Sequence, residues 1–148
     1  GLHGKRPERE KTRRRPRPGY RGVMKAVLVY VTAPDHATAR RLARCVVKAR
    51  LAACANLLPA IESIYWWKGS IEAGAEVALI LKTRAPLVPR LTAELLRLHP
   101  YECPCVVALP ILGGNPAFLR WIGAETRPAP AGRKTRRAGA GKPASVSR

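Results

Sequence analysis

Two of the four cysteines in this 148-residue sequence are spaced so that they could bind a metal ion. Cys103 and Cys105 are separated only by Pro104. In an extended strand, residues two apart point to the same face, so we expect both thiols on one side of the chain. Thiolates are soft ligands that suit Cu(I) or zinc, although the Cys-x-x-Cys spacing of many zinc sites is absent. The pair could therefore hold a metal ion, or both thiols could be inert core side chains.

Two further residues could supply a third ligand to this pair. Cys54 could be a soft metal ligand or a small buried apolar side chain. His99 comes just before Pro100, where a predicted helix ends, so it could cap that end or bind a metal ion or an anion. The remaining thiol, Cys45, is interpreted as a packing residue within a helix. No export signal is found in the sequence, so we expect a reducing compartment in which the cysteines are free thiols.

A second candidate site is formed by three consecutive aromatic residues, Tyr65, Trp66 and Trp67. They could form a wall on which a small molecule stacks, or an interface between copies of the chain. We favour the interface, because Trp and Tyr are enriched where proteins associate. The two roles are compatible, since ligand clefts often form between subunits.

Several classes of protein are not indicated by the sequence. It contains no Ser/His/Asp set, no P-loop and no paired acid/base motif within one segment, so we do not predict an enzyme. No apolar run approaches the ~20 residues that span a bilayer, and no apolar segment of a secretory signal follows the basic N-terminal region. We therefore expect a cytoplasmic protein with no membrane partner.

The positive charge of the chain, a formal +19, is concentrated near its two ends. Residues 1–23 carry nine Lys and Arg against two Glu, and residues 127–148 carry seven Lys and Arg and no acid. Both segments are rich in Pro, Gly and Arg and have few large apolar residues, so we predict that both are disordered. Polyanion binding by them would be non-specific and sensitive to salt. The folded domain is predicted to span residues 24–126.

Hydrophobic patterns within residues 24–126 predict four strands and three helices. The predicted strands span 24–33, 52–67, 70–84 and 103–112. The predicted helices span 35–50, from Pro86 to just before His99, and 116–122. Asp35 is a suitable N-cap for the first helix, and Pro59 predicts a bulge in the second strand. Lys68-Gly69 predicts a tight turn between the second and third strands, which then form a long hairpin.

This order of elements is typical of the α+β, ferredoxin-like βαββαβ fold with a short C-terminal helix added. Such a fold has one antiparallel sheet with two helices on one face. The other face would carry Trp and Tyr, which is too apolar for the surface of a monomer. The hairpin is longer than the strands of most small sheets. We therefore expect it to pair with a neighbouring copy in a closed homo-oligomer.

Several short motifs follow one another in this domain. They are Thr32-Ala33-Pro34-Asp35, Leu51-Ala52-Ala53-Cys54-Ala55-Asn56, Tyr65-Trp66-Trp67-Lys68-Gly69, Glu76, Leu81-Lys82-Thr83, His99-Pro100-Tyr101-Glu102-Cys103-Pro104 and Phe118-Leu119-Arg120-Trp121-Ile122. In this order they closely resemble the CutA divalent-cation tolerance family. The resemblance implies a homotrimer with an architecture similar to that of the PII signalling proteins, and a link to copper and other divalent metals. It implies no catalytic mechanism.

The resemblance also indicates polar residues that could line a cleft between subunits. They are Glu76, Lys82, Tyr101 and Glu102. Glu102 joins the candidate metal ligands, while Lys82 could bind an anion or form an ion pair with Glu76. The sequence departs from the family pattern at two positions. Ser70 stands where the family commonly has Lys, and Cys105 stands where it often has Glu. A cysteine in place of Glu would soften a metal site towards Cu(I).

The sequence as a whole predicts a trimeric divalent-cation tolerance protein that binds copper or another divalent metal ion and takes part in metal homeostasis. The alternative is a PII-like signalling trimer that binds a small ligand in the cleft between subunits.

Overall fold

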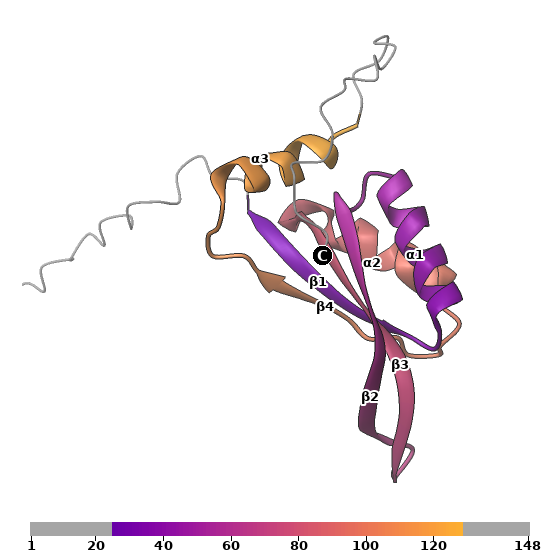
Figure 1. The fold of residues 1–148 in the computed structure, drawn as a ribbon. Helices are drawn as coiled ribbons and strands as arrows, with labels where there is room; N and C mark the ends of the chain where they lie inside the picture. The colour runs from indigo at the N-terminus through magenta and orange to yellow at the C-terminus, as the bar shows by residue number, and fades with distance from the viewer. Residues whose placement is uncertain (1–24, 129–148) are drawn as a thin grey trace, which may run out of the picture.

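The computed structural model describes residues 25–128, which form a four-stranded sheet and three α-helices (Figure 1). The elements in chain order are β1 (Ala26–Ala33), α1 (His36–Lys48), β2 (Cys54–Trp67), β3 (Ser70–Arg84), the 3₁₀ turn η1 (Ala85–Leu87), α2 (Val88–Leu98), β4 (Val106–Pro110) and α3 (Pro116–Glu125). The predicted α+β class and order of elements are confirmed. The predictions for residues 1–23, and those for residues 129–148, lie outside the described residues.

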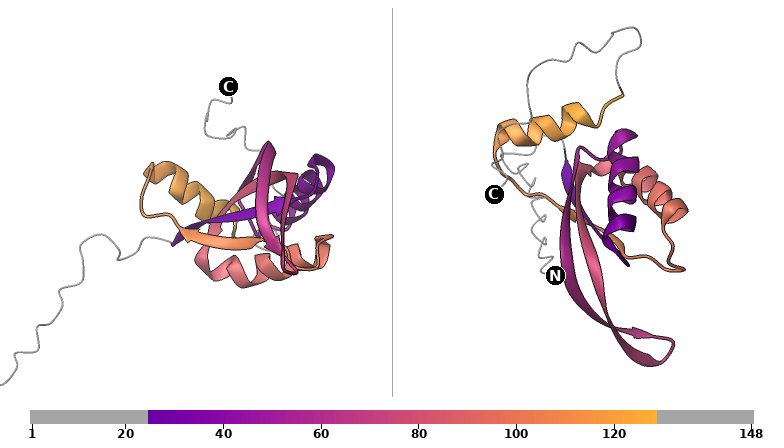
Figure 2. Two further views of the ribbon diagram at one scale, coloured as in Figure 1. Left: turned by 90° about the horizontal axis from the view of Figure 1, so that it is seen from below. Right: turned by 45° about the vertical axis from the view of Figure 1, so that its right-hand side comes forward.

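The sheet has the strand order β2-β3-β1-β4, and every neighbouring pair is antiparallel. This is the predicted ferredoxin-like arrangement, in which β1 and β3 lie at the centre and the chain crosses over twice through helices. Helices α1 and α2 lie together on one face of the sheet (Figure 2). Within residues 25–128, no helix is long and apolar enough to cross a membrane.

The main core lies between these two helices and the sheet. Alternate residues of β1, including Val29 and Val31, are fully buried and point towards the helices, as the two-residue period of a strand requires. Leu42 of α1 and Leu95 of α2 meet them from the other side and are also fully buried. Replacing one of these leucines with alanine is expected to destabilise the fold by about 2–5 kcal/mol.

Helix α1 begins as the sequence predicts and ends slightly earlier. Asp35 is the N-cap, and its carboxylate accepts a hydrogen bond of 2.7 Å from the backbone N–H of Thr38. This bond is the main reason why the pKa of Asp35 is lowered. The helix ends at Lys48, because Arg50 adopts a left-handed backbone conformation with φ of 58°. That conformation is usual just beyond a helix C-terminus, although glycine is its usual residue.

The long hairpin extends well beyond the rest of the sheet (Figure 1). Its turn has positive φ at both central residues, 48° at Lys68 and 83° at Gly69, which is the pattern of a type I′ turn. The register shifts between Leu58 and Ile61, around Pro59. Both the predicted turn and the predicted bulge are confirmed.

The fourth strand is shorter than predicted, and this changes the position of the two cysteines. It begins at Val106, so Cys103 and Cys105 lie in the loop before it, and the expectation that they share one face of a strand is wrong. Pro104 lies between them and has no N–H to donate to a ladder. In addition, β1 pairs with β4 only as far as Val31, which lies opposite Val106, so the residues before Val106 have no partner on β1.

The face of the sheet opposite α1 and α2, called the open face below, is covered only at one end. There, α3 packs its buried Ile122 against Ala26 and Ala53, with Phe118 and Leu119 partly buried beside it. Much of the rest of this face and of the hairpin is exposed and apolar. The large exposed residues in these strands are Leu58, Ile64, Tyr65, Trp66, Trp67, Ile71, Val107 and Leu109. The apolar surface predicted from the sequence is therefore present.

Candidate functional site

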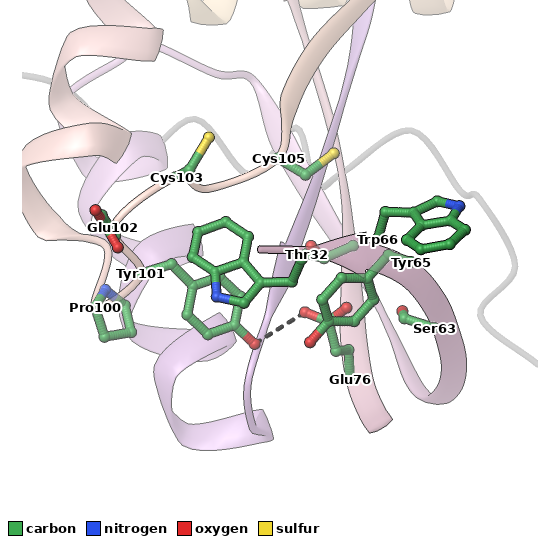
Figure 3. A pocket seen from close by; sticks show the side chains of 11 residues that line it. Thr32, Ser63, Tyr65, Trp66, Glu76, Pro100, Tyr101, Glu102, Cys103 and Cys105 are labelled. Atoms are coloured by element: carbon green, nitrogen blue, oxygen red, sulfur yellow. Dashed lines mark hydrogen bonds between the residues drawn. The ribbon is translucent and has the colours of Figure 1, made fainter. Parts of the chain in front are cut away.

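A hollow of about 630 Å³, called the aromatic pocket below, lies between the protruding part of the hairpin and the loop that joins α2 to β4 (Figure 3). Its lining residues are Thr32, Ser63, Tyr65, Trp66, Trp67, Glu76, Pro100, Tyr101, Glu102, Cys103 and Cys105. Eight residues singled out from the sequence are therefore brought together. Three others, Cys54, Lys82 and His99, do not line the pocket.

Tyr101 and Glu76 join the two sides of the pocket through a hydrogen bond. The Tyr101 hydroxyl donates to the Glu76 carboxylate over 2.9 Å, as the dashed line in Figure 3 shows. Burial, reinforced by this bond to Glu76, raises the pKa of Tyr101 well above its ordinary value. The phenol therefore keeps its proton and acts as a donor, which orients the Glu76 carboxylate.

His99 is buried behind Tyr101 and uses both ring nitrogens to hold backbone groups. Its Nδ1 accepts a hydrogen bond of 3.1 Å from the Tyr101 N–H, and its Nε2 lies 2.7 Å from the Thr32 carbonyl oxygen. Because a carbonyl can only accept, Nε2 carries the proton and the ring is the neutral tautomer. Metal binding by His99 would require one of these bonds to break. In this conformation His99 positions the loop that carries Tyr101.

Cys103 and Cys105 lie on the same loop at one side of the pocket (Figure 3). Cys103 is exposed, whereas Cys105 is partly buried. Burial, with a smaller contribution from the charge of Glu76, raises the pKa of the Cys105 thiol. A metal ion that binds there must therefore displace a proton. Within residues 25–128, no group of three His, Cys, Asp or Glu side chains is arranged to hold a metal ion.

Cys54 and Lys82 face each other on β2 and β3, away from the aromatic pocket. The Lys82 ammonium lies 3.9 Å from the Cys54 sulfur and donates a hydrogen bond to the Asn56 side-chain oxygen. Glu76 is six residues from Lys82 along β3, a separation of about 20 Å in a strand. The ion pair between Lys82 and Glu76 that the sequence left open is therefore not formed.

Two hydroxyl residues in the pocket, Thr32 and Ser63, are not among the candidate site residues that the sequence indicates. Ser63 could have been found, because Ser63, Tyr65 and Trp67 alternate along β2 and so share one face. Thr32 belongs to one of the motifs that resemble the family, but neither that motif nor the strand pattern predicts that it lines a pocket. Its place in the pocket depends on the packing of β1 against the loop after α2, which involves residues far apart in the sequence.

The ferredoxin-like sheet, the protruding hairpin and the pocket beside it define a class of small α+β proteins. Comparison with known proteins identifies the family: the model of the CutA1 divalent ion tolerance protein family matches residues 27–125. This chain belongs to that family.

Relatives are found in plants, animals and bacteria. Protein CutA 1, chloroplastic, from Oryza sativa is 45% identical over 102 residues, which is 69% of this chain and 58% of the relative. Protein CutA from Mus musculus is 50% identical over 93 residues, or 63% of this chain and 52% of the relative. The chain thus spans little more than half the length of these relatives. The divalent-cation tolerance protein CutA of Pectobacterium atrosepticum is 40% identical, over 69% of this chain and 93% of the relative.

Solved structures agree with this assignment. CutA1 from Oryza sativa superposes with a TM-score of 0.69 and 43% identity, covering 72% of this chain and 98% of that structure. The periplasmic divalent cation tolerance protein CutA from Archaeoglobus fulgidus gives a TM-score of 0.67 and 39% identity, covering 69% and 99%. The fold and the family are therefore shown together.

Proposed function

We propose that this protein is a homotrimer that binds copper, or another divalent metal ion, in the aromatic pocket and takes part in metal homeostasis. The observation that carries the proposal is the position of Cys103 and Cys105, whose thiols line the same pocket as the carboxylates of Glu76 and Glu102. Soft thiolates favour Cu(I) over harder ions. No catalytic role is proposed.

The metal site would be completed between subunits. Residues 25–128 of one chain provide no group of three His, Cys, Asp or Glu side chains arranged to hold a metal ion, so the thiols of Cys103 and Cys105 and the carboxylate of Glu102 do not form a complete site by themselves. The pocket is open to one side, beside the exposed Trp66. A neighbouring copy that covers this side would exclude water and could contribute a further ligand. His99 and Cys54 remain candidate ligands only if the loop or the assembly rearranges.

The oligomer is supported by the exposed surfaces of the single chain. The open face and the hairpin expose large apolar side chains, which usually marks an interface. The strands β2 and β4 are the two edges of the sheet, so each leaves one row of backbone groups for another strand. The proposed number of three subunits follows the resemblance to the family.

The test is a titration of the reduced full-length protein with Cu(I) held by a competing chelator, with zinc and Cu²⁺ in parallel. The test variant is Cys103→Ser/Cys105→Ser, and the matched thiol control is Cys45→Ser, which changes a cysteine on α1. We expect about one Cu(I) per subunit, lost in the double variant and retained in the control. Equal affinity in all three proteins would overturn the proposal.

A second candidate function is supported by the size and lining of the same pocket. Its volume of about 630 Å³ lies within the range of small-molecule sites, about 300–1,000 Å³. Tyr65, Trp66 and Tyr101 provide aromatic surfaces on which a flat ligand could stack. A PII-like signalling trimer would use the pocket in this way. Cu²⁺ near Trp66 would quench tryptophan fluorescence, whereas a stacked ligand would shift its emission.

The remaining proposals concern location and additional partners. The cytoplasmic location stays a prediction, because the Oryza sativa relative is named chloroplastic and the Archaeoglobus fulgidus structure is described as periplasmic. Non-specific polyanion binding by the basic terminal segments also stays a prediction. Comparing the full chain with residues 24–126 at several salt concentrations tests it, because metal binding should survive the truncation whereas polyanion binding should not.

A further inference from the structure

A second hollow, of about 440 Å³, lies at the end of the sheet away from the hairpin turn. It is lined by residues from the end of α1, the end of β3, the start of α2 and the segment after α3. Four of these residues are cationic and none is acidic: Lys48, Arg50, Arg84 and Arg90. This basic pocket shares no lining residue with the aromatic pocket.

Two of the four cations are held in place by the end of α3. Arg84 donates from Nε to the Thr126 hydroxyl over 2.9 Å and from Nη2 to the Thr126 carbonyl over 3.0 Å. Arg50 donates from Nη1 to the carbonyl and the carboxylate of Glu125, over 3.2 and 3.1 Å. A guanidinium has five N–H donors, so each arginine keeps donors for a ligand while its orientation is fixed.

The other two cations, Lys48 and Arg90, are exposed at the edge of the pocket. Within residues 25–128, the structure shows no hydrogen bond or ion pair from either side chain. Glu125 is the one carboxylate bonded to the group in this part of the chain, and it offsets one of the four positive charges.

Arg50 lies just beyond the end of α1, where its left-handed φ of 58° terminates the helix. The carbonyls of Cys45, Val46 and Val47 accept hydrogen bonds from N–H groups just beyond α1, which reduces the negative charge exposed at this helix end. The first turn of α2, opposite, contains no acidic residue.

We propose that the basic pocket binds a small anion with two linked phosphate groups, such as pyrophosphate. A single phosphate group carries about −1.5 to −2 charge at neutral pH, so two linked groups come closer to the net charge of +3 that remains after Glu125 offsets one of the four cations. Arg50 and Arg84 would form forked hydrogen bonds to phosphate oxygens, and Lys48 and Arg90 would add charge at the edge. This proposal does not depend on metal binding in the aromatic pocket.

The test is calorimetric titration of metal-free full-length protein with pyrophosphate at constant ionic strength, with inorganic phosphate in parallel. The test variant is Lys48→Gln/Arg90→Gln. The matched control is Arg40→Gln/Arg44→Gln, which removes two exposed charges from another part of α1. Both variants keep the anchored Arg50 and Arg84, and thermal melting checks that both fold.

We expect pyrophosphate to bind more tightly than phosphate. The test variant should bind it about tenfold more weakly or worse, since it loses two cations close to the anion and each contributes Coulomb attraction even in water, and the control should match the wild type. An equal loss in both variants would assign the binding to overall charge, including the basic terminal segments, and would overturn the proposal. A wild-type protein with no measurable affinity for pyrophosphate would overturn it as well.

Discussion

At the scale of residues, a short series of hydrogen bonds shapes the wall of the aromatic pocket. His99 connects the Thr32 carbonyl to the Tyr101 N–H, and the Tyr101 hydroxyl holds Glu76. These bonds tie the loop after α2 to β1 and β3. The loop that carries both candidate thiols is therefore anchored at its start.

The bond between Tyr101 and Glu76 can be tested by removing one hydroxyl group. Tyr101→Phe should lower the free energy of unfolding by about 1 kcal/mol, because a partly buried hydrogen bond is lost. Tyr65→Phe is the matched control, since the structure shows no hydrogen bond from the Tyr65 hydroxyl within residues 25–128, and it should change stability little. Urea denaturation of both variants measures the difference. Equal effects would contradict the assigned role of Tyr101.

The two thiols of the pocket are expected to differ in reactivity. The pKa of Cys105 is raised by burial, so less thiolate is present at a given pH and its alkylation by iodoacetamide should be slow at pH 7. Cys103 is exposed and should react first. Raising the pH should speed the reaction of Cys105 and also strengthen Cu(I) binding, since the proton no longer competes. Mass spectrometry of tryptic peptides follows both sites, and faster labelling of Cys105 than of Cys103 at pH 7 would contradict this.

The sequence predicts most of the residues of the aromatic pocket, but not their detailed roles. It predicts Cys103 and Cys105 on a strand, whereas the structure has them in the loop before β4, on either side of Pro104. The sequence alone does not decide whether His99 caps the helix end or binds a ligand, and only the positions of Thr32 and Tyr101 show that both ring nitrogens are engaged. Such contacts depend on the tertiary structure, so no local pattern predicts them.

At the scale of elements, the hairpin shows how closely local sequence determined the fold. Lys68-Gly69 predicts the turn because glycine accepts positive φ, and Pro59 predicts the bulge because it cannot donate to the ladder. The limits of the strands were predicted less well. The first residue of β4 depends on how far this strand pairs with β1. Because β1 is distant in sequence, the local pattern does not predict where β4 begins.

Two glycines of the hairpin provide a test of this explanation. Gly69 has φ of 83°, so Gly69→Ala should lower the free energy of unfolding by about 1–2 kcal/mol through backbone strain. Gly74 has no such conformation and open space around its Cβ position, so Gly74→Ala should be neutral or slightly stabilising. Chemical denaturation of both variants checks the contrast. A loss at Gly74 as large as that at Gly69 would show that the turn conformation is not the cause.

At the scale of the whole molecule, the exposed apolar residues favour an assembly of several copies. Val107 lies opposite Tyr30 on the open face and is 50% exposed, whereas Leu96 is 51% exposed on α2. The two residues are equally accessible in the single chain. In the proposed trimer, Val107 on the open face becomes buried, whereas Leu96 on α2 stays exposed.

This difference predicts the outcome of two matched substitutions. Val107→Lys should dissociate the oligomer, because an unpaired charge would be buried at the interface. Leu96→Lys should leave the oligomer intact. Light scattering after size-exclusion chromatography measures the mass of each variant. A trimer that persists in Val107→Lys, or a wild-type protein that is monomeric, would contradict the proposed assembly.

The central claim is that copper binds through the thiols of Cys103 and Cys105, and X-ray absorption at the copper edge tests it most directly. The full-length protein loaded with one Cu(I) per subunit should show sulfur as the main neighbour of the metal. The Cys103→Ser/Cys105→Ser variant should lose this sulfur signal, and Cys45→Ser should keep it. A copper environment of nitrogen and oxygen alone in the wild type, or sulfur neighbours that persist in the double variant, would contradict the thiolate site.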